Sequence, residues 1–183
     1  MYTSKLLNKQ VAAILSSGGV GVAPTDTVYG ILARAASEQA VDRVFRLRER
    51  TSTKPCIILI SSPEDMLNFG ASGADVIRAK PYWPAPITLI FNVKNQPQHL
   101  TRGKTSLAFR MPDKLELRKL IKTTGPLIAP SANPETQPTA ATIKQAKKYF
   151  ASNVDFYVGT NTTLTASPST ILDLTGAQPS QIR

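Results

Sequence analysis

The chain has 183 residues, of which 42% are hydrophobic, and this proportion excludes an intrinsically disordered protein. No apolar run approaches the ~18 residues that a membrane-spanning helix needs, so we expect no contact with a membrane. Lysine and arginine outnumber acidic residues by 22 to 12, which gives a net charge of +10. This excess favours anionic partners such as nucleotides, pyrophosphate or RNA, although a basic chain also gains solubility from it.

The N-terminal segment is predicted to be a helix rather than a signal peptide. Apolar residues at 6–15 follow helical spacing, and polar residues interrupt them before a continuous apolar segment forms. Gly18 and Gly19 are expected to end this helix. The single cysteine, Cys56, allows no internal disulfide and suits a reducing compartment. We therefore expect a cytoplasmic protein.

Strand and helix patterns alternate along the rest of the chain. Runs of β-branched and apolar residues predict strands at 19–23, 56–60, 87–93, 106–110, 126–129 and 169–174. Helix signals stand at Ser37, Pro63, Ala74 and Thr142, and Asp113 with Glu116 forms a capping-box pattern. The pattern predicts an α/β fold, with a mixed sheet and helices packed on it, in one domain over residues 1–183.

Three polar loops follow predicted strands or helices, and they carry the candidate chemistry. The first is PTDTVYG, Pro24–Gly30, which places hydroxyls, a carboxylate and a phenol between apolar residues. Pro24 ends the preceding strand, and Gly30 is expected to permit a tight turn. The local pattern alone also fits an ordinary strand–loop–helix connection.

The second loop, Arg46–Pro55, is rich in cations. Arg48 and Arg50 are two residues apart and do not share a face of a helix, but an extended segment after a helix that ends near Arg48 aims both at one anion. Guanidinium groups bind phosphate oxygens bidentately, and Lys54 adds a compact charge. The alternative is a solvated helix C-terminus, which cations also stabilise.

The third loop, Ala129–Thr142, follows a predicted buried strand. Its side chains that can donate to a nucleotide are Ser131, Asn133, Thr136 and Thr139, although plain connecting loops have the same composition. His99 and Cys56 have no partner in a motif, so we expect His99 in a surface loop and Cys56 as a buried small hydrophobic residue. The carboxylates are dispersed, and no metal site is indicated.

Taken together, the motifs resemble those of one family. PTDTVYG, RxR followed by KP, WPAPITL, LAFRMP, PSAN and STILDL stand in the order and spacing of the YrdC/TsaC family of threonylcarbamoyl-adenylate synthases, over nearly the whole chain. The pairing of PTDTVYG with PSAN is the most specific part. The resemblance implies the short single-domain form with a YrdC-like fold: a twisted mixed β-sheet, surrounding helices and a basic concave surface.

The resemblance also implies an activity. The family makes L-threonylcarbamoyl-adenylate and pyrophosphate from L-threonine, bicarbonate and ATP, and a separate transferase complex uses the product to form N6-threonylcarbamoyladenosine (t6A) at position 37 of tRNA. The reaction brings two anions together, so we expect positioning and cationic screening to dominate catalysis, without a covalent nucleophile. ATP use implies Mg²⁺ carried on the phosphates.

The roles of individual residues follow from the same resemblance. The residues implied for L-threonine are Thr25, Thr27, Tyr29, Arg110 and Ser169, with Arg110 pairing the carboxylate. The residues implied for the nucleotide are Ser131, Asn133, Thr139 and Arg183, together with the catalytic, triphosphate-facing Arg48, Arg50 and Lys54.

Three positions depart from the family pattern, and three other functions stay open. Arg48 stands where lysine is usual, Ala85 where glycine is usual, and Glu135 in SANPETQ adds a negative charge near the expected nucleotide.

One alternative is a module that binds double-stranded RNA or tRNA, with an affinity that falls steeply with salt. The others are a nucleotide-binding relative without synthase activity and a carbamoyl-adenylate enzyme for another small substrate.

Overall fold

The computed structural model describes residues 1–183 except 52, 160–162 and 165–166. Its strands are β1 (Tyr2–Ser4), β2 (Gly21–Pro24), β3 (Tyr29–Arg34), β4 (Ile57–Leu59), β5 (Ile87–Asn92), β6 (Ser106–Arg110), β7 (Leu127–Ile128), β8 (Phe156–Val158), β9 (Thr170–Asp173) and β10 (Ser180–Gln181). Its α-helices are α1 (Lys9–Ser16), α2 (Glu38–Leu47), α3 (Gly73–Ala79), α4 (Gln98–Thr101), α5 (Leu115–Thr124) and α6 (Ile143–Phe150), and the 3₁₀ helices are η1 (Pro63–Phe69) and η2 (Lys80–Tyr82).

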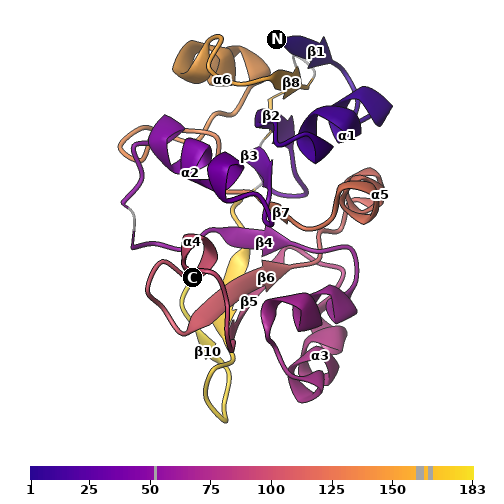
Figure 1. The fold of residues 1–183 in the computed structure, drawn as a ribbon, viewed down its shortest axis with the longest axis vertical. Coiled ribbons are helices and arrows are strands. Elements are labelled where there is room, and N and C mark those ends of the chain that lie inside the picture. The colour runs from indigo at the N-terminus through magenta and orange to yellow at the C-terminus, as the bar shows by residue number, and fades with distance from the viewer. Residues whose placement is uncertain (52, 160–162, 165–166) are drawn as a thin grey trace.

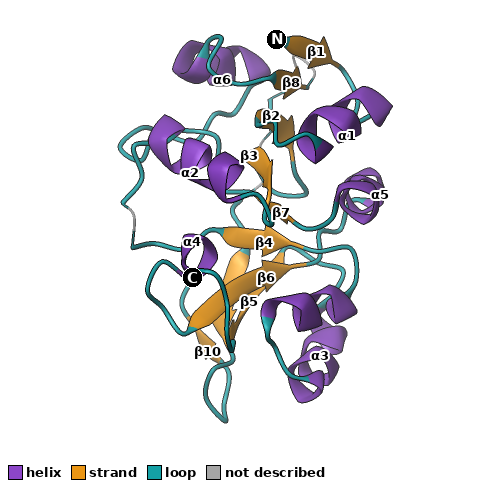
Figure 2. Ribbon diagram, viewed as in Figure 1, coloured by secondary structure: helices purple, strands orange, loops and turns teal. Residues whose placement is uncertain are grey.

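In the described part of the chain the strands form one mixed sheet of ten strands, in the order β1-β8-β2-β3-β7-β4-β6-β5-β9-β10. Parallel pairs such as β4–β6 and β5–β9 stand beside antiparallel pairs such as β5–β6. The twisted sheet runs from β1 and β8 at one end of the molecule to β10 at the other (Figure 1). Helices α1 and α5 lie on one side of it, and α2 and α6 lie on the other (Figure 2). The predicted α/β class with a mixed sheet is confirmed.

Strands β3 and β4 are buried on both faces. Ile31 and Ile58 belong to a core that includes α2 and α6, whereas Leu32 and Leu59 belong to a core that includes α1 and α5. Successive side chains of a strand point to opposite faces, so consecutive apolar residues are what a strand covered on both faces requires. The prediction for 56–60 is therefore confirmed. Cys56 is buried there, and burial raises the pKa of its thiol.

The helix starts predicted at Ser37 and Thr142 are confirmed. Each hydroxyl oxygen accepts a hydrogen bond from the amide three residues later, at 3.3 Å and 3.1 Å respectively. The prediction that helical structure reaches back to Leu6 is wrong. The helix begins at Lys9, and residues 2–4 pair with β8 as a parallel strand.

The capping box predicted at Asp113 and Glu116 is also wrong. Lys114 occupies the N-cap of α5, which has no side-chain cap hydrogen bond. The backbone amide of Asp113 instead donates to the Asp26 carboxylate at 3.2 Å, and Lys114 Nζ donates to the carbonyl of Pro24 at 3.0 Å. These contacts hold the start of α5 against the loop after β2.

The segment PTDTVYG joins two antiparallel strands. Pro24 pairs with Tyr29, so residues 25–28 form the turn of a hairpin. The prediction that Gly30 serves a tight turn is wrong, because Gly30 lies inside β3. A Cβ atom there would lie 3.2 Å from Thr25 Cγ2 and 3.3 Å from the carbonyl oxygen of Pro130. Glycine at this position therefore allows a close approach of two loops.

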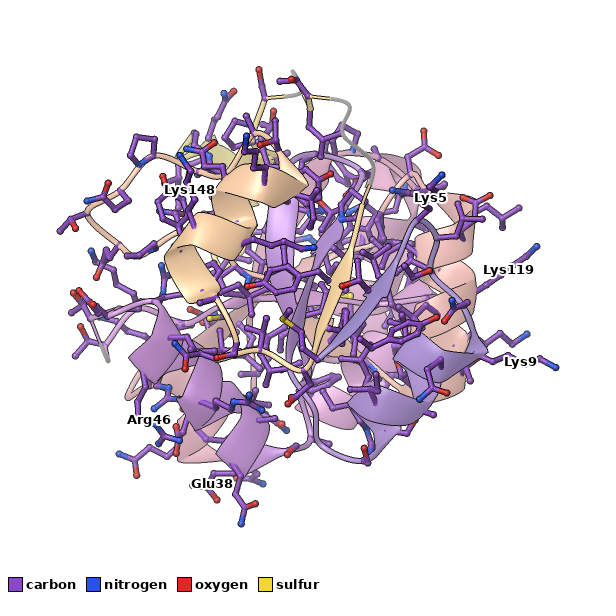
Figure 3. The ribbon with its side chains drawn as sticks, turned by 90° about the horizontal axis from the view of Figure 1, so that it is seen from above. Lys5, Lys9, Glu38, Arg46, Lys119 and Lys148 are labelled. Atoms are coloured by element: carbon purple, nitrogen blue, oxygen red, sulfur yellow. The ribbon has the colours of Figure 1, made fainter. Side chains whose placement is uncertain are left out.

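Cations are spread over several faces of the molecule. Lys5, Lys9 and Lys119 point outward on one side, whereas Lys148 on α6 lies on another (Figure 3). The cations behind the net charge of +10 are therefore not gathered on one face of the molecule. Within the described residues, the helices all lack the length and apolar character needed to cross a membrane.

Candidate active site

A cavity of about 450 Å³ lies over the sheet. Its walls come from the turn after β2, the segment after α2 and the loop after β7, and residues of β4, β5, β6 and β9 also line it. Strand β6 shows how the fold positions these side chains. Ser106, Ala108 and Arg110 line the cavity, and Leu107 also contributes to its lining, whereas Phe109 packs in the hydrophobic core.

The cavity is strongly cationic. No carboxylate is found among its described lining residues, but five cations are: Arg48, Arg50, Lys104, Arg110 and Arg183. Burial, together with the charge of Arg50, lowers the pKa of Arg48 to about 10. Burial also lowers the pKa of Arg110, an effect that Asp26 opposes and Arg183 reinforces. An anionic ligand in the cavity would therefore offset the cost of burying these cations.

Arg48 is buried, with 3% of its surface exposed, and it is held from one side only. Its Nε donates to the carbonyl oxygen of Asn133 at 3.0 Å, and its Nη2 donates to Ser131 Oγ at 3.1 Å. The buried Nη1 has no hydrogen-bond partner within the described structure. Since buried donors are normally paired, Nη1 is a ready donor for a ligand in the cavity.

The hairpin turn and Arg110 form one chain of hydrogen bonds. Arg110 Nη2 donates to Thr27 Oγ1 at 3.3 Å, and Thr25 Oγ1 donates to the carbonyl of Val28 at 2.7 Å. The Thr25 proton is thus committed, so the 3.0 Å contact between the two hydroxyls requires Thr27 to be the donor. Thr25 Oγ1 also accepts from the Thr27 amide at 3.1 Å, which uses its remaining lone pair. Thr27 therefore keeps more capacity for a ligand than Thr25 does.

Arg110 also lies beside a buried carboxylate. Its Nη2 is 3.2 Å from Asp26 Oδ1, and the two side chains are 4% and 2% exposed. This distance makes an ion pair, although Asp26 Oδ1 has no aligned hydrogen bond in the described structure. Arg110 Nε likewise has no partner there, which leaves the guanidinium with donor capacity toward the cavity.

The C-terminal strands supply the far side of the cavity. Ser169 Oγ lies 2.9 Å from Thr88 Oγ1, and both residues are buried. Arg183 Nε donates to the carbonyl of Ser169 at 3.1 Å, which places Arg183 at the rim. The structure thus brings most of the sequence-predicted residues to one cavity: Thr25, Thr27, Arg48, Arg50, Arg110, Ser131, Thr139, Ser169 and Arg183.

Three predicted site residues do not line this cavity. Tyr29 lies in the hydrophobic core, where burial raises the pKa of its phenol. Asn133 supports the loop after β7, because its Nδ2 donates to the carbonyls of Pro134 and Gln137 at 2.8 and 2.7 Å. Lys54 points to the carboxylate of Glu135, with Nζ 2.7 Å from Oε1.

Sequence reasoning missed two polar residues of the cavity lining, Lys104 and Ser106, and it gave no role to Asp26, which lies beside Arg110 outside the lining. Ser106 had a usable signal, because it lies four residues before Arg110 on the same strand and therefore shares its face. Lys104 lies in the connection before that strand and Asp26 in the hairpin turn, and local patterns do not show where either side chain points. The expectation that His99 lies in a surface loop is wrong, because His99 is partly buried on α4, with Nε2 3.0 Å from the carbonyl oxygen of Ala35.

Comparisons with known proteins agree on the family. The model for Sua5, YciO and YrdC proteins, described as "Telomere recombination", matches residues 13–183. A threonylcarbamoyl-AMP synthase of Pseudomonas fluorescens is 31% identical over 178 residues, which cover 91% of each chain. A threonylcarbamoyl-AMP synthase of Pyrococcus abyssi is 32% identical over 176 residues, which cover 94% of this chain and 52% of that protein.

A solved structure of a relative has a similar fold. The P. abyssi Sua5 protein in complex with L-threonine has 29% sequence identity and a TM-score of 0.87. The match covers 100% of this chain and 56% of that one. The chain thus spans about half the length of the Pyrococcus relatives and most of the length of the Pseudomonas relative.

Proposed function

Because the chain belongs to the Sua5/YciO/YrdC family, we propose that it is a threonylcarbamoyl-AMP synthase. It would transfer the adenylyl group of ATP to a carbamate made from L-threonine and bicarbonate, and release pyrophosphate. The observation that carries this proposal is one cavity that Arg48, Arg50, Arg110 and Arg183 all line, with no carboxylate among its described lining residues. Several cations in one cavity suit two substrates that both carry anionic groups, the triphosphate of ATP and the carboxylate of threonine.

The proposed reaction needs little covalent chemistry from the protein. Bicarbonate supplies carbon dioxide and hydroxide, the amine of threonine bonds to the carbon of carbon dioxide, and the proton that the amine loses combines with the hydroxide to form water. An oxygen of the resulting carbamate then attacks the α-phosphorus of ATP. The bond between that phosphorus and the bridging oxygen breaks, and the electrons leave with pyrophosphate. Because a carbamate and a triphosphate repel each other, Arg48 and Arg50 would hold the phosphates while Arg110 orients the threonine carboxylate. No nucleophilic side chain is required.

Magnesium is part of the proposal as an ion that enters with ATP. The described residues contain no group of three histidine, cysteine or acidic side chains that could hold a metal. The donor set of the cavity is cationic and hydroxylic, which does not suit a metal site built by the protein. When bound to the phosphates, magnesium would screen their charge beside the arginines.

The proposed product also implies a second enzyme that uses it as a substrate. A mixed anhydride of a carbamate and a phosphate is reactive toward water, so a transferase that delivers the group to tRNA adenosine should act soon after release. We therefore propose proteins of a t6A transferase complex as partners, in the cytoplasm. Reconstitution with such a complex and an ANN-decoding tRNA should yield t6A, and a failure to do so with active synthase would reject this partnership.

The synthase proposal is tested by conversion of ATP to AMP, with threonine and bicarbonate each supplied or withheld. We expect turnover only when both are present, and Arg50→Ala should abolish it because Arg50 lines the cavity beside Arg48. AMP formation that ignores threonine, or ATP binding without any AMP, would reject the proposal. Salt-sensitive RNA binding without threonine-dependent turnover would instead favour the nucleic-acid-binding module.

A further inference from the structure

Glu135 holds two loops together beside the cavity. Its Oε2 accepts hydrogen bonds from the backbone amide and the hydroxyl of Thr51, at 2.7 and 2.9 Å. Its Oε1 lies 2.7 Å from Lys54 Nζ. Its own backbone amide donates to the carbonyl of Arg48 at 2.7 Å. We name the contacts of Glu135 with Thr51 and Lys54 the latch.

The latch is connected to Arg50 through backbone carbonyl groups. Arg50 Nε donates to the carbonyl of Lys54 at 3.2 Å, and Arg50 Nη2 donates to the carbonyl of Pro55 at 3.2 Å. These two carbonyls therefore set the direction of the Arg50 guanidinium. They lie directly after the segment that Glu135 holds at Thr51 and Lys54, so release of the latch would free the carbonyls and the guanidinium together.

We propose that Glu135 is a positioning residue for the nucleotide, and that Lys54 serves the latch instead of binding phosphate. The proposal rests on the synthase function proposed above. Lys54 does not line the cavity, and its ammonium group already has a carboxylate partner at hydrogen-bond distance. The side chain of Lys54 is 59% exposed, so the ion pair alone contributes little. Two hydrogen bonds from Thr51 to the same carboxylate add to it.

The latch should stay closed over the working pH range. The hydrogen bonds from Lys54 and Thr51 lower the pKa of Glu135 to about 2. The carboxylate therefore remains charged at neutral pH, and the latch is a constant part of the nucleotide side of the cavity. Titration of Glu135 near neutral pH should therefore not open it.

Kinetics and binding of three variants test this role. In Glu135→Ala we expect KM for ATP to rise about tenfold, equal to about 1.4 kcal/mol, with KM for threonine unchanged. Glu135→Gln keeps an oxygen for Thr51 but loses the charge facing Lys54. Its KM for ATP should therefore lie between the values of the parent and of Glu135→Ala. Adding Lys54→Ala to Glu135→Ala should change KM for ATP by less than about twofold, because both changes break the same latch.

Two opposite results would overturn the proposal. If Glu135 only competes with phosphate for Lys54, Glu135→Ala should bind ATP more tightly. If Lys54 binds phosphate, its removal should weaken ATP binding in the Glu135→Ala background as much as in the parent. Glu116→Gln, which removes one exposed carboxylate on α5, is the matched control for net charge and should leave both KM values unchanged.

A second readout separates the latch from the synthase proposal. The Thr51 amide should exchange its hydrogen slowly in the parent and faster in Glu135→Ala, and calorimetry should show weaker ATP binding in the absence of threonine. If the parent makes no threonine-dependent AMP but both changes occur, the latch stands and the synthase assignment fails. If turnover is threonine-dependent but neither change occurs, the latch fails and the synthase assignment stands.

Discussion

Arg48 Nε donates a hydrogen bond to the carbonyl oxygen of Asn133 at 3.0 Å, although 85 residues separate the two in sequence. The contact is reciprocated nearby, where the amide of Glu135 donates to the carbonyl of Arg48 at 2.7 Å. The end of α2 and the loop after β7 are therefore one structural unit. A substitution in either segment should therefore change how the cavity binds the nucleotide.

Replacing Arg48 by lysine should weaken ATP binding about tenfold while the fold is kept. Lysine keeps the charge but lacks the planar fork, so it cannot donate to Asn133, Ser131 and an anion in fixed directions. Arg48→Met should also lower the free energy of unfolding by about 1.5–3 kcal/mol, because it leaves buried acceptors unpaired. Calorimetric titration and urea unfolding measure the two effects, and parental ATP affinity in Arg48→Lys would contradict the prediction.

Local patterns predicted the elements that carry their own signals. The helix starts at Ser37 and Thr142 are short-range, because each hydroxyl caps an amide three residues away. Apolar runs likewise located β4 and β6. The order of the strands depends on pairing between distant segments, as in the parallel pairing of β1 with β8, and no local pattern encodes it.

Site residues within one short segment could be predicted from the sequence. The direction of a side chain could not be predicted where a contact with a distant segment determines it. The sequence predicts Arg48, Arg50 and Lys54 as one cationic group, but the structure turns Lys54 toward Glu135, 81 residues away. From the sequence, Glu135 is predicted only as a negative charge near the nucleotide, because its contacts with Thr51 and Lys54 are not visible there. The residue type alone therefore could not separate a phosphate ligand from a support residue.

Gly30→Ala should impair both the use of threonine and the stability of the fold. The new Cβ would crowd Thr25 and the carbonyl oxygen of Pro130, which is held by the amide of Ile31 at 2.9 Å. The hairpin turn must then shift, with kcat/KM for threonine falling about tenfold or more and the free energy of unfolding falling by about 1–3 kcal/mol. Gly73→Ala is the matched control, because its Cβ would meet nothing within 4 Å. Equal kinetics in the two variants would refute this prediction.

Asp155 should stabilise the fold in a pH-dependent way. Burial raises its pKa, but hydrogen bonds from Arg43 and from the Val20 amide outweigh this effect, and the net pKa is lowered. A carboxyl group whose pKa is lower in the folded state stabilises above its unfolded pKa of about 3.9, and this contribution is lost as the pH falls through the folded value. Because 38% of the side chain is exposed, we expect Asp155→Asn to cost only about 1 kcal/mol at pH 7.

Urea unfolding of the parent and of Asp155→Asn between pH 2 and 7 checks this prediction. The difference in unfolding free energy should be largest at neutral pH and should shrink below about pH 4. Asp113→Asn is the control, because its carboxylate is 67% exposed and lies 3.8 Å from Arg118. A difference that grows as the pH falls would mean that the sign is wrong.

The buried pair of Asp26 and Arg110 allows stability and threonine binding to be separated. Arg110→Met leaves the Asp26 carboxylate buried without its ion-pair partner, and removal of one partner of such a pair costs about 3–5 kcal/mol. Adding Asp26→Asn removes the stranded charge, so the double variant should recover most of this loss in urea unfolding. It should not recover threonine binding, because the cation proposed to pair the substrate carboxylate is still absent. Calorimetric titration with threonine in the double variant is decisive, since the fold is then intact. If the double variant binds threonine as the parent does, Arg110 is a structural residue, and the substrate carboxylate must be bound by another cation of the cavity, such as Arg183.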